Sequence, residues 1–219
     1  MPHGKQFTLY TNSLWINGWA VVFVLNRLGL SYDCHQIDKT TVNGPEYLKY
    51  NPNGRIPTLV DHKNNDFAIW ESAAIVLYLV DRYDPNHQIS VTNPDEKATM
   101  IQWLFFQAAG QGPYYGQAGH FLYYHSEKVP SAIERYQNET RRVLGVLESV
   151  LSKQEFLVGG KLTVADIIFV HCNIMLEPLL GAEFNFEKEF PATFAWHSKV
   201  TASDGVKEGL EERQKAWSA

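Results

Sequence analysis

Residues 51–60 read NPNGRIPTLV, and residues 70–75 read WESAAI. Pro57 has a fixed φ and no backbone N–H, so the turn before it is rigid and Ile56 is held in an extended conformation. The apolar run that follows predicts a strand over residues 58–61, bounded on its N-terminal side by this turn.

The second segment has the chemistry of a receptor for an amino-acid head group. Glu71 and Ser72 open an apolar helix, where free backbone N–H groups, the serine hydroxyl and the positive end of the helix dipole favour a carboxylate. The Glu71 carboxylate can pair with an ammonium group at the same place. If the Ile56–Pro57 bond is cis, the preceding peptide group is turned outward, where another peptide can pair with it. The sequence therefore predicts a site for a small peptide.

The remaining part of the first 86 residues predicts alternating strands and helices. Strands are expected at residues 7–10, 32–37, 58–61 and 67–70, helices at residues 19–28 and 72–83, and a short helix or turn at residues 43–50. Gly29 is typical of a helix C-terminus, and the helix before it makes the strand at 32–37 parallel to the first. Residues 62–66 are typical of a hairpin turn. The order βαβαββα predicts a mixed four-stranded sheet with helices against it.

The rest of the chain is expected to be helical, which gives the class α/β plus all-α. We expect one domain at residues 1–86, a linker at 87–93 with turn residues and no periodicity, and a helical domain at 94–219. Its long amphipathic segments are residues 94–109 and 132–152. Thr163, with Asp166 three positions later, is a variant of the capping box, and we interpret this pair as structural rather than catalytic.

Composition limits the class of protein. The chain has 219 residues, of which 45% are hydrophobic and 20% charged, and this suits a folded protein with a sizeable core. The formal charge of -5 argues against nucleic acid as a partner. No apolar stretch approaches the roughly 20 residues that span a bilayer. The only cysteines, Cys34 and Cys172, form no Cys-x-x-Cys motif. We expect a cytoplasmic protein with no membrane partner.

The ordered pattern N-P-N-x-x-x-P-x-L-V, then E-S-x-A-I, resembles the N-terminal, thioredoxin-like domain of cytosolic glutathione transferases. The resemblance implies that the residue before a cis-proline, Ile56 before Pro57, pairs with the cysteinyl backbone of glutathione. It also implies that Glu71 and Ser72 hold the γ-glutamyl end. Arg55 would add positive charge near the tripeptide, which is negatively charged, or is simply a solvated turn residue.

Glutathione chemistry needs the thiolate, because the free thiol has a pKa of about 8.5. A donor between the first strand and first helix would favour it, and the candidates are Tyr10, Thr11, Asn12, Ser13 and Asn17. Tyr10 lies early, and an aromatic at a strand end is usually in the core. Ser13 does not align with the serine of the serine-type classes. The Asn17 amide can donate to a thiolate, and the alternative is a plain N-cap.

The second half narrows the resemblance to one subgroup. The runs WLFFQ at 103–107, GQAGHF at 116–121 and RRV at 141–143 are similar to the fungal nitrogen-catabolite-regulator type, which bacterial disulfide-bond oxidoreductase transferases also resemble. In that subgroup an asparagine of an Asn-Gly pair contacts the glutathione sulfur, which implies this role for Asn17. Members often show disulfide-reductase or peroxidase-like activity. The loop at 39–44 is shorter than the family's, so no residue is assigned to the glycine carboxylate.

The resemblance therefore implies a glutathione transferase, usually a homodimer, with glutathione as co-substrate and no permanently bound cofactor. The second-substrate pocket would draw on Leu14, Trp15, Phe106, Tyr114, Tyr115 and His120, although such aromatics are also typical of a core or a dimer interface. No histidine spacing suits a metal, and His120 and His125 are expected to face opposite ways. The alternative is a non-catalytic binding protein on the same scaffold, either a ligandin or a regulator of a transcription factor.

Overall fold

The computed structural model describes residues 4–218, with the side chains of residues 217 and 218 excepted. The chain forms two compact units, residues 1–90 with 202–219, and residues 91–201. The break after residue 90 falls inside the predicted linker. The C-terminal segment differs from the expectation, because residues 202–219 belong to the first unit and not to the helical domain predicted at 94–219.

Two glycines explain why the last helix, α12 (Val206–Ser218), packs on α1 (Asn17–Arg27). Gly205 has a φ of +82°, and a Cβ placed there would lie 2.4 Å from the Arg27 backbone nitrogen. A Cβ on Gly209 would lie 2.6 Å from Cδ1 of Phe23. Only glycine permits this approach, so the turn before α12 lies against the Arg27 backbone and α12 packs closely on the Phe23 ring.

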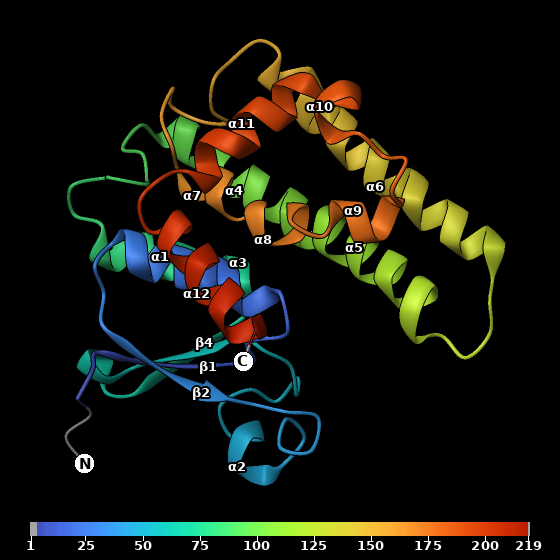
Figure 1. The fold of residues 1–219 in the computed structure, drawn as a ribbon. Coiled ribbons are helices and arrows are strands. Elements are labelled where there is room, and N and C mark those ends of the chain that lie inside the picture. Colours follow the sequence, from blue (N-terminus) through green and yellow to red (C-terminus); the bar gives the residue numbers. More distant parts are fainter. Residues whose placement is uncertain (1–3, 219) are drawn as a thin grey trace. The chain divides into compact units, whose positions relative to one another are not determined.

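The first unit contains the predicted four-stranded mixed sheet (Figure 1). The strands β1 (Phe7–Thr11), β2 (Tyr32–Gln36), β3 (Thr58–Asp61) and β4 (Phe67–Trp70) lie in the order β2-β1-β3-β4. β1 and β2 are parallel, and the other two pairings are antiparallel. The helices are α1, α2 (Pro45–Leu48) and α3 (Ser72–Tyr83), with a 3₁₀ turn η1 (His62–Asn64) inside the hairpin. The predicted order βαβαββα is confirmed.

The second unit is helical, as predicted. Its helices are α4 (Pro94–Phe106), α5 (Gly112–Gly119), α6 (Pro130–Leu151), α7 (Val164–Ile167), α8 (Val170–Asn173), α9 (Leu176–Leu180), α10 (Phe186–Glu189) and α11 (Pro191–Thr201). Two π-helical segments, η2 (Gln107–Gln111) and η3 (His120–Tyr124), flank α5. The sequence predicts one regular helix over residues 94–109, but α4 ends at Phe106 and the chain continues as the π-helical segment η2.

The Thr163–Asp166 pair forms a capping box at the start of α7 and is structural, as interpreted from the sequence. Asp166 is fully buried. Its Oδ2 accepts from the Thr163 backbone N–H at 2.9 Å, and its Oδ1 accepts from Leu157 N and from Trp196 Nε1, both at 2.9 Å. Burial raises the pKa of the Asp166 carboxyl, while these hydrogen bonds lower it. The carboxylate thus ties the loop before α7 to α11.

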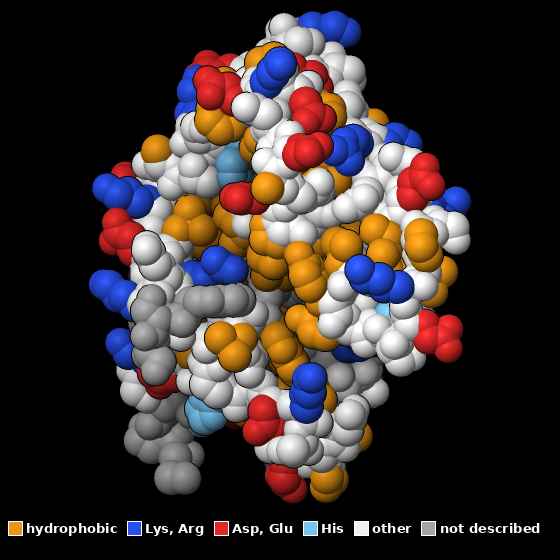
Figure 2. All heavy atoms as spheres, turned by 45° about the vertical axis from the view of Figure 1, so that its right-hand side comes forward, with side chains coloured by type: hydrophobic (Ala, Val, Ile, Leu, Met, Phe, Trp, Pro, Cys, Tyr) orange, Lys and Arg blue, Asp and Glu red, His pale blue; other side chains and the backbone are white. Residues whose placement is uncertain are grey.

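The surface gives two simple observations. Within residues 4–218, no helix combines the length and the apolar character that a bilayer crossing needs. Figure 2 shows acidic and basic side chains of the described residues interspersed over the face in view. That face therefore lacks the single-sign basic area that a phosphate backbone attracts.

Candidate active site

The sheet register brings three predicted site segments to one edge of the first unit. Tyr10 at the end of β1 pairs with Thr58 at the start of β3, and Thr58 pairs with Trp70 at the end of β4. At this edge β1 leads into the loop before α1, and β4 leads into the start of α3 (Figure 1). The Ile56–Pro57 turn lies at the same edge, because it leads into β3. Residues far apart in sequence share this edge because β3 is antiparallel to both of its neighbours.

Asn17 is the first residue of α1, and its side chain is exposed. The N-cap is Ile16, so the plain N-cap role that the sequence left open for Asn17 is not what the backbone shows. No hydrogen bond of the Asn17 amide is found among the described residues. Gly18, which follows, is buried, and a Cβ there would lie 1.8 Å from Oγ1 of Thr11. This glycine fixes the start of α1 against the end of β1.

Three of the other donor candidates, Tyr10, Thr11 and Asn12, are held in structural contacts. Asn12 Nδ2 donates to Ile37 O at 2.9 Å, and Asn12 Oδ1 accepts from Leu14 N at 2.9 Å. Thr11 is buried under Gly18. The Tyr10 ring stacks on Tyr50, and burial raises the pKa of its phenol to about 12.

The backbone of Ser13 is held in place, while its hydroxyl forms no hydrogen bond within the described residues. Its N–H donates to Gln36 Oε1 at 3.0 Å, and its carbonyl accepts from Trp19 Nε1 at 3.2 Å. The Asn17 side chain is therefore the amide in this loop that stays available for a ligand.

The Ile56–Pro57 bond is cis, and a buried polar network holds the turn before it. The Arg55 carbonyl accepts from the Tyr47 hydroxyl at 2.5 Å and from Asn51 Nδ2 at 2.7 Å. Both donors also contact the Thr58 hydroxyl, at 2.8 and 3.0 Å. Tyr47, Asn51 and Thr58, which hold this turn, are not among the site residues predicted from the sequence. An asparagine directly before a proline, at Asn51, was the available signal.

At the start of α3, Glu71 has a φ of +73° and a ψ of 118°, which is unusual for a residue with a Cβ. Its carbonyl accepts from Ile75 N at 2.9 Å, its side chain is exposed, and Ser72 is half-buried. Such backbone strain concentrates at ligand sites, so the outlier itself points to function. The exposed Arg55 side chain lies just before the cis bond.

The six residues expected around a second substrate divide between the two units. Leu14, 55% exposed, and Trp15 belong to the first unit, where Trp15 packs beside a buried cluster that contains Ile56. In the second unit, Phe106 and Tyr114 are half-buried and His120 is exposed. Tyr115 is only 2% exposed, and burial raises the pKa of its phenol. Tyr115 is therefore part of the helical core rather than of an open pocket.

One expectation about histidines is wrong. The rings of His120 and His125 do not face opposite ways but lie 5.5 Å apart, because η3 is a π-helical turn closed by His125 N–H to His120 O at 2.8 Å. A π turn brings residues i and i+5 together, whereas in an α-helix they would point in nearly opposite directions. Within residues 4–218 no group of three or more His, Cys, Asp or Glu side chains is arranged to hold a metal.

This combination of a thioredoxin-like sheet domain with a helical domain defines the class of protein. The N-terminal domain of the glutathione S-transferases matches residues 5–81, and their C-terminal domain matches residues 113–204. The chain belongs to the glutathione S-transferase family. "Glutathione S-transferase 1" of Schizosaccharomyces pombe is 46% identical over 96% of this chain and 98% of its own length.

Within the family, the chain is similar to the Ure2p-type transferases of fungi. The glutathione transferase URE2P6 from Phanerochaete chrysosporium, solved with oxidized glutathione, is 57% identical, covers 99% of this chain and 100% of its own, and superimposes with a TM-score of 0.95. "Protein URE2" of Candida albicans is 35% identical over 94% of this chain and 70% of its own length. The predicted subgroup is thereby confirmed.

Proposed function

We propose that the bound glutathione thiolate of this transferase attacks a disulfide, a hydroperoxide or a soft electrophile. The observation that supports the proposal most strongly is the shared sheet edge. The loop that carries Asn17, the cis-proline turn and the strained start of α3 all lie at this edge. A 57% identical neighbour that holds oxidized glutathione supports it. Oxidized glutathione is the product that disulfide or hydroperoxide reduction would leave.

Each part of the site then has a role toward glutathione. The backbone of Ile56 pairs with the cysteinyl peptide group, and Glu71 pairs with the γ-glutamyl ammonium. Ser72 and the free N–H groups of α3 receive the γ-glutamyl carboxylate. Arg55 adds positive charge beside a ligand of net negative charge.

Asn17 is the residue that acts on the sulfur. Its Nδ2 donates a hydrogen bond to the thiolate, and the N-terminal dipole of α1 favours the same negative charge. Both contributions lower the thiol pKa and raise the fraction of nucleophile at neutral pH.

Disulfide reduction needs no protein cysteine. The thiolate attacks one sulfur of the substrate disulfide, forms a mixed disulfide with glutathione, and expels the other half as a thiolate that takes up a proton. A second glutathione thiolate then attacks the mixed disulfide, which releases the second thiol and oxidized glutathione. Two glutathione molecules supply the two electrons, so the reaction balances without a further reductant.

Steady-state turnover of hydroxyethyl disulfide and of an aryl halide with glutathione tests this proposal, with wild type and Asn17→Ala. We expect disulfide turnover that falls at least about tenfold in the variant, which corresponds to about 1.4 kcal/mol of transition-state stabilisation. Ser13→Ala is the matched control, because its side chain lies in the same loop. Equal turnover in wild type and Asn17→Ala would contradict the role of Asn17.

A second function, binding without catalysis, is favoured by the 35% identity to proteins named URE2. In that case the scaffold would hold a hydrophobic ligand or a transcription factor. Turnover no faster than the uncatalysed reaction with every glutathione co-substrate, alongside micromolar binding of aromatic ligands, would favour this alternative. Under either function we propose a homodimer, with an isologous two-fold contact.

A further inference from the structure

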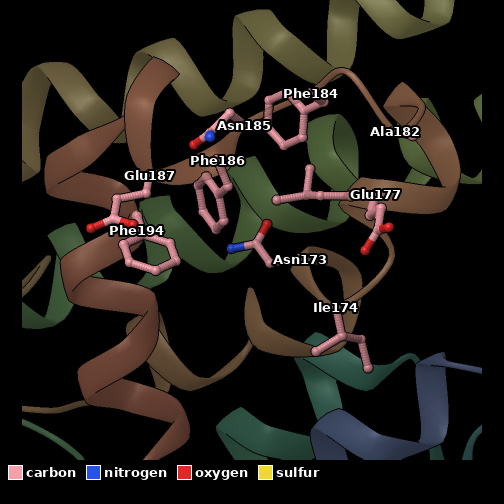
Figure 3. A pocket seen from close by; sticks show the side chains of 10 residues that line it. Asn173, Ile174, Glu177, Ala182, Phe184, Asn185, Phe186, Glu187 and Phe194 are labelled. Carbon is pink, nitrogen blue, oxygen red and sulfur yellow. The ribbon is translucent and has the colours of Figure 1, made fainter.

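A cavity of about 460 Å³ lies within the helical unit, at the turns that join α8, α9, α10 and α11 (Figure 3). Its volume is within the range of small-molecule sites. Its lining includes Asn173, Glu177, Phe184, Phe186, Glu187 and Phe194. None of them belongs to the glutathione site proposed above, so the cavity needs its own explanation.

One wall of the cavity is aromatic. The rings of Phe184 and Phe186 lie 6.1 Å apart at an interplanar angle of 25°, and Phe194 meets Phe186 edge to face at 5.6 Å. The Arg141 guanidinium lies 5.7 Å from the centroid of Phe184. A ring of this wall thus already accepts a cation, through the attraction between positive charge and an aromatic face.

The side chains that line the cavity carry negative charge, whereas Arg141 lies beside its Phe184 wall. Glu177 and Glu187 are the ionisable residues among those that line it, both are exposed, and neither forms an ion pair within the described part of the chain. In the view of Figure 3 they lie on opposite sides of the aromatic group. Two unpaired carboxylates beside aromatic faces attract an organic cation and repel an anion.

A buried amide at the floor supplies a hydrogen-bond donor. Asn173 is 3% exposed, and its Oδ1 accepts from Gln111 Nε2 at 2.8 Å, which fixes the orientation of the amide. Gln111 Oε1 in turn accepts from Gln107 Nε2 at 3.3 Å, so a row of amides in η2 ends at the cavity. Asn173 Nδ2 has no partner among the described residues, and Figure 3 shows it directed toward the phenylalanine rings.

We propose that this cavity binds a small organic cation that has an apolar body and a hydrogen-bond acceptor. The cationic centre lies against the phenylalanine faces near Glu177 or Glu187, the apolar body fills the aromatic wall, and the acceptor receives the free Asn173 N–H. A buried donor without a partner is uncommon in proteins, and such a ligand would satisfy it. Glutathione and its conjugates are anionic, so this site selects a different chemical class from the proposed active site.

Isothermal titration with benzoylcholine tests the proposal, because this probe joins an aromatic ring, an ester carbonyl and a quaternary ammonium. We expect saturable 1:1 binding with a dissociation constant below about 1 mM. The neutral isostere 3,3-dimethylbutyl benzoate should bind at least about fivefold more weakly, because it loses the attraction of the cation to the rings and carboxylates.

Variants locate the binding. The double variant Glu177→Gln/Glu187→Gln changes exposed residues, and Phe186→Leu keeps an apolar side chain without the aromatic face. Each should weaken benzoylcholine binding at least about fivefold. Glu183→Gln is the matched control, since this exposed acid of the same loop does not line the cavity. No saturation up to about 10 mM, equal affinity for the neutral ester, or an equal loss in Glu183→Gln would overturn the proposal.

Discussion

At the scale of single residues, Glu71 combines a strained backbone with an exposed carboxylate. A residue with a Cβ in such a conformation costs about 1–3 kcal/mol, which the surrounding structure must offset. Strain of this size is retained where a side chain has to point in a direction that relaxed backbone does not allow. In the proposed function, that direction is toward the ammonium group of glutathione.

Glu71→Gln should therefore weaken glutathione binding while the backbone conformation is kept. We expect the dissociation constant to rise about fivefold, equivalent to about 1 kcal/mol, because the lost charge pair is exposed to solvent. Isothermal titration with reduced glutathione measures it. Glu46→Gln, an exposed acid on α2, is the control and should bind as wild type does. An unchanged affinity in Glu71→Gln would remove Glu71 from the site.

His171 is a second residue with a measurable signature. It is 1% exposed, its Nε2 lies 3.3 Å from Cys172 Sγ, and burial lowers its pKa to about 4. The unfolded chain binds a proton near pH 6.5 and the folded chain does not, so stability falls as pH decreases from about 6.5 toward 4. The raised pKa of Asp166 acts in the opposite direction, which calls for a comparison between variants.

His171→Gln should flatten that pH dependence. Between pH 6.5 and 4.5 the unfolding free energy of wild type should fall by about 2 kcal/mol more than that of the variant. Urea unfolding at a series of pH values provides the comparison. His120→Gln, at an exposed histidine, should leave the curve as in wild type. Parallel curves for wild type and His171→Gln would contradict this prediction, because they would mean that His171 binds the same number of protons in the folded and the unfolded chain.

At the scale of elements, the join between β1 and α1 depends on Gly18. A Cβ at this position would lie 1.8 Å from Thr11 Oγ1, far inside van der Waals contact. Gly18→Ala should destabilise the protein by about 3 kcal/mol or more, as overpacking in a rigid core does, and Thr11→Ala in the same chain should restore part of the loss. Gly145→Ala in α6 meets nothing within 4 Å and should be neutral or stabilising. Thermal unfolding of the four proteins tests this, and a Gly18→Ala variant as stable as Gly145→Ala would contradict it.

Local patterns predicted most elements of the fold. β3 and α3 have the bounds expected at 58–61 and 72–83, because a proline and a Glu-Ser pair mark their starts in the sequence itself. The π-helical segments were not predicted, since a hydrophobic pattern of period 3.6 does not register one extra residue in a turn. The buried network of Tyr47, Asn51 and Thr58 depends on long-range packing, which no local pattern encodes.

At the scale of the whole molecule, the placement of residues 202–219 with the first unit shows the same limit. From sequence alone, the charged helix α12 is predicted to continue the helical domain that precedes it. The helix packs on α1 instead because Gly205 and Gly209 allow a close contact that any larger residue would prevent. The chain therefore crosses back to complete the unit that contains the proposed glutathione site.

Large apolar side chains at the surface support the proposed homodimer. Within the described residues they are Leu14 (55% exposed), Phe67 (44%), Trp70 (37%), Phe105 (69%), Tyr123 (60%) and Tyr124 (77%). We propose that some of these side chains are covered in the homodimer contact. Light scattering at micromolar concentration should give about twice the chain mass of 25.0 kDa. A single-chain mass would contradict the dimer.

The central claim is that Asn17 stabilises the glutathione thiolate, and the thiol pKa of bound glutathione tests it most directly. Ultraviolet thiolate absorbance, titrated against pH with saturating glutathione, reports this value for wild type, Asn17→Ala and Ser13→Ala. Wild type and Ser13→Ala should hold the pKa at least about one unit below the free value of about 8.5, and Asn17→Ala should return it toward that value. The same thiol pKa in wild type and Asn17→Ala, with glutathione bound in both, would contradict the claim.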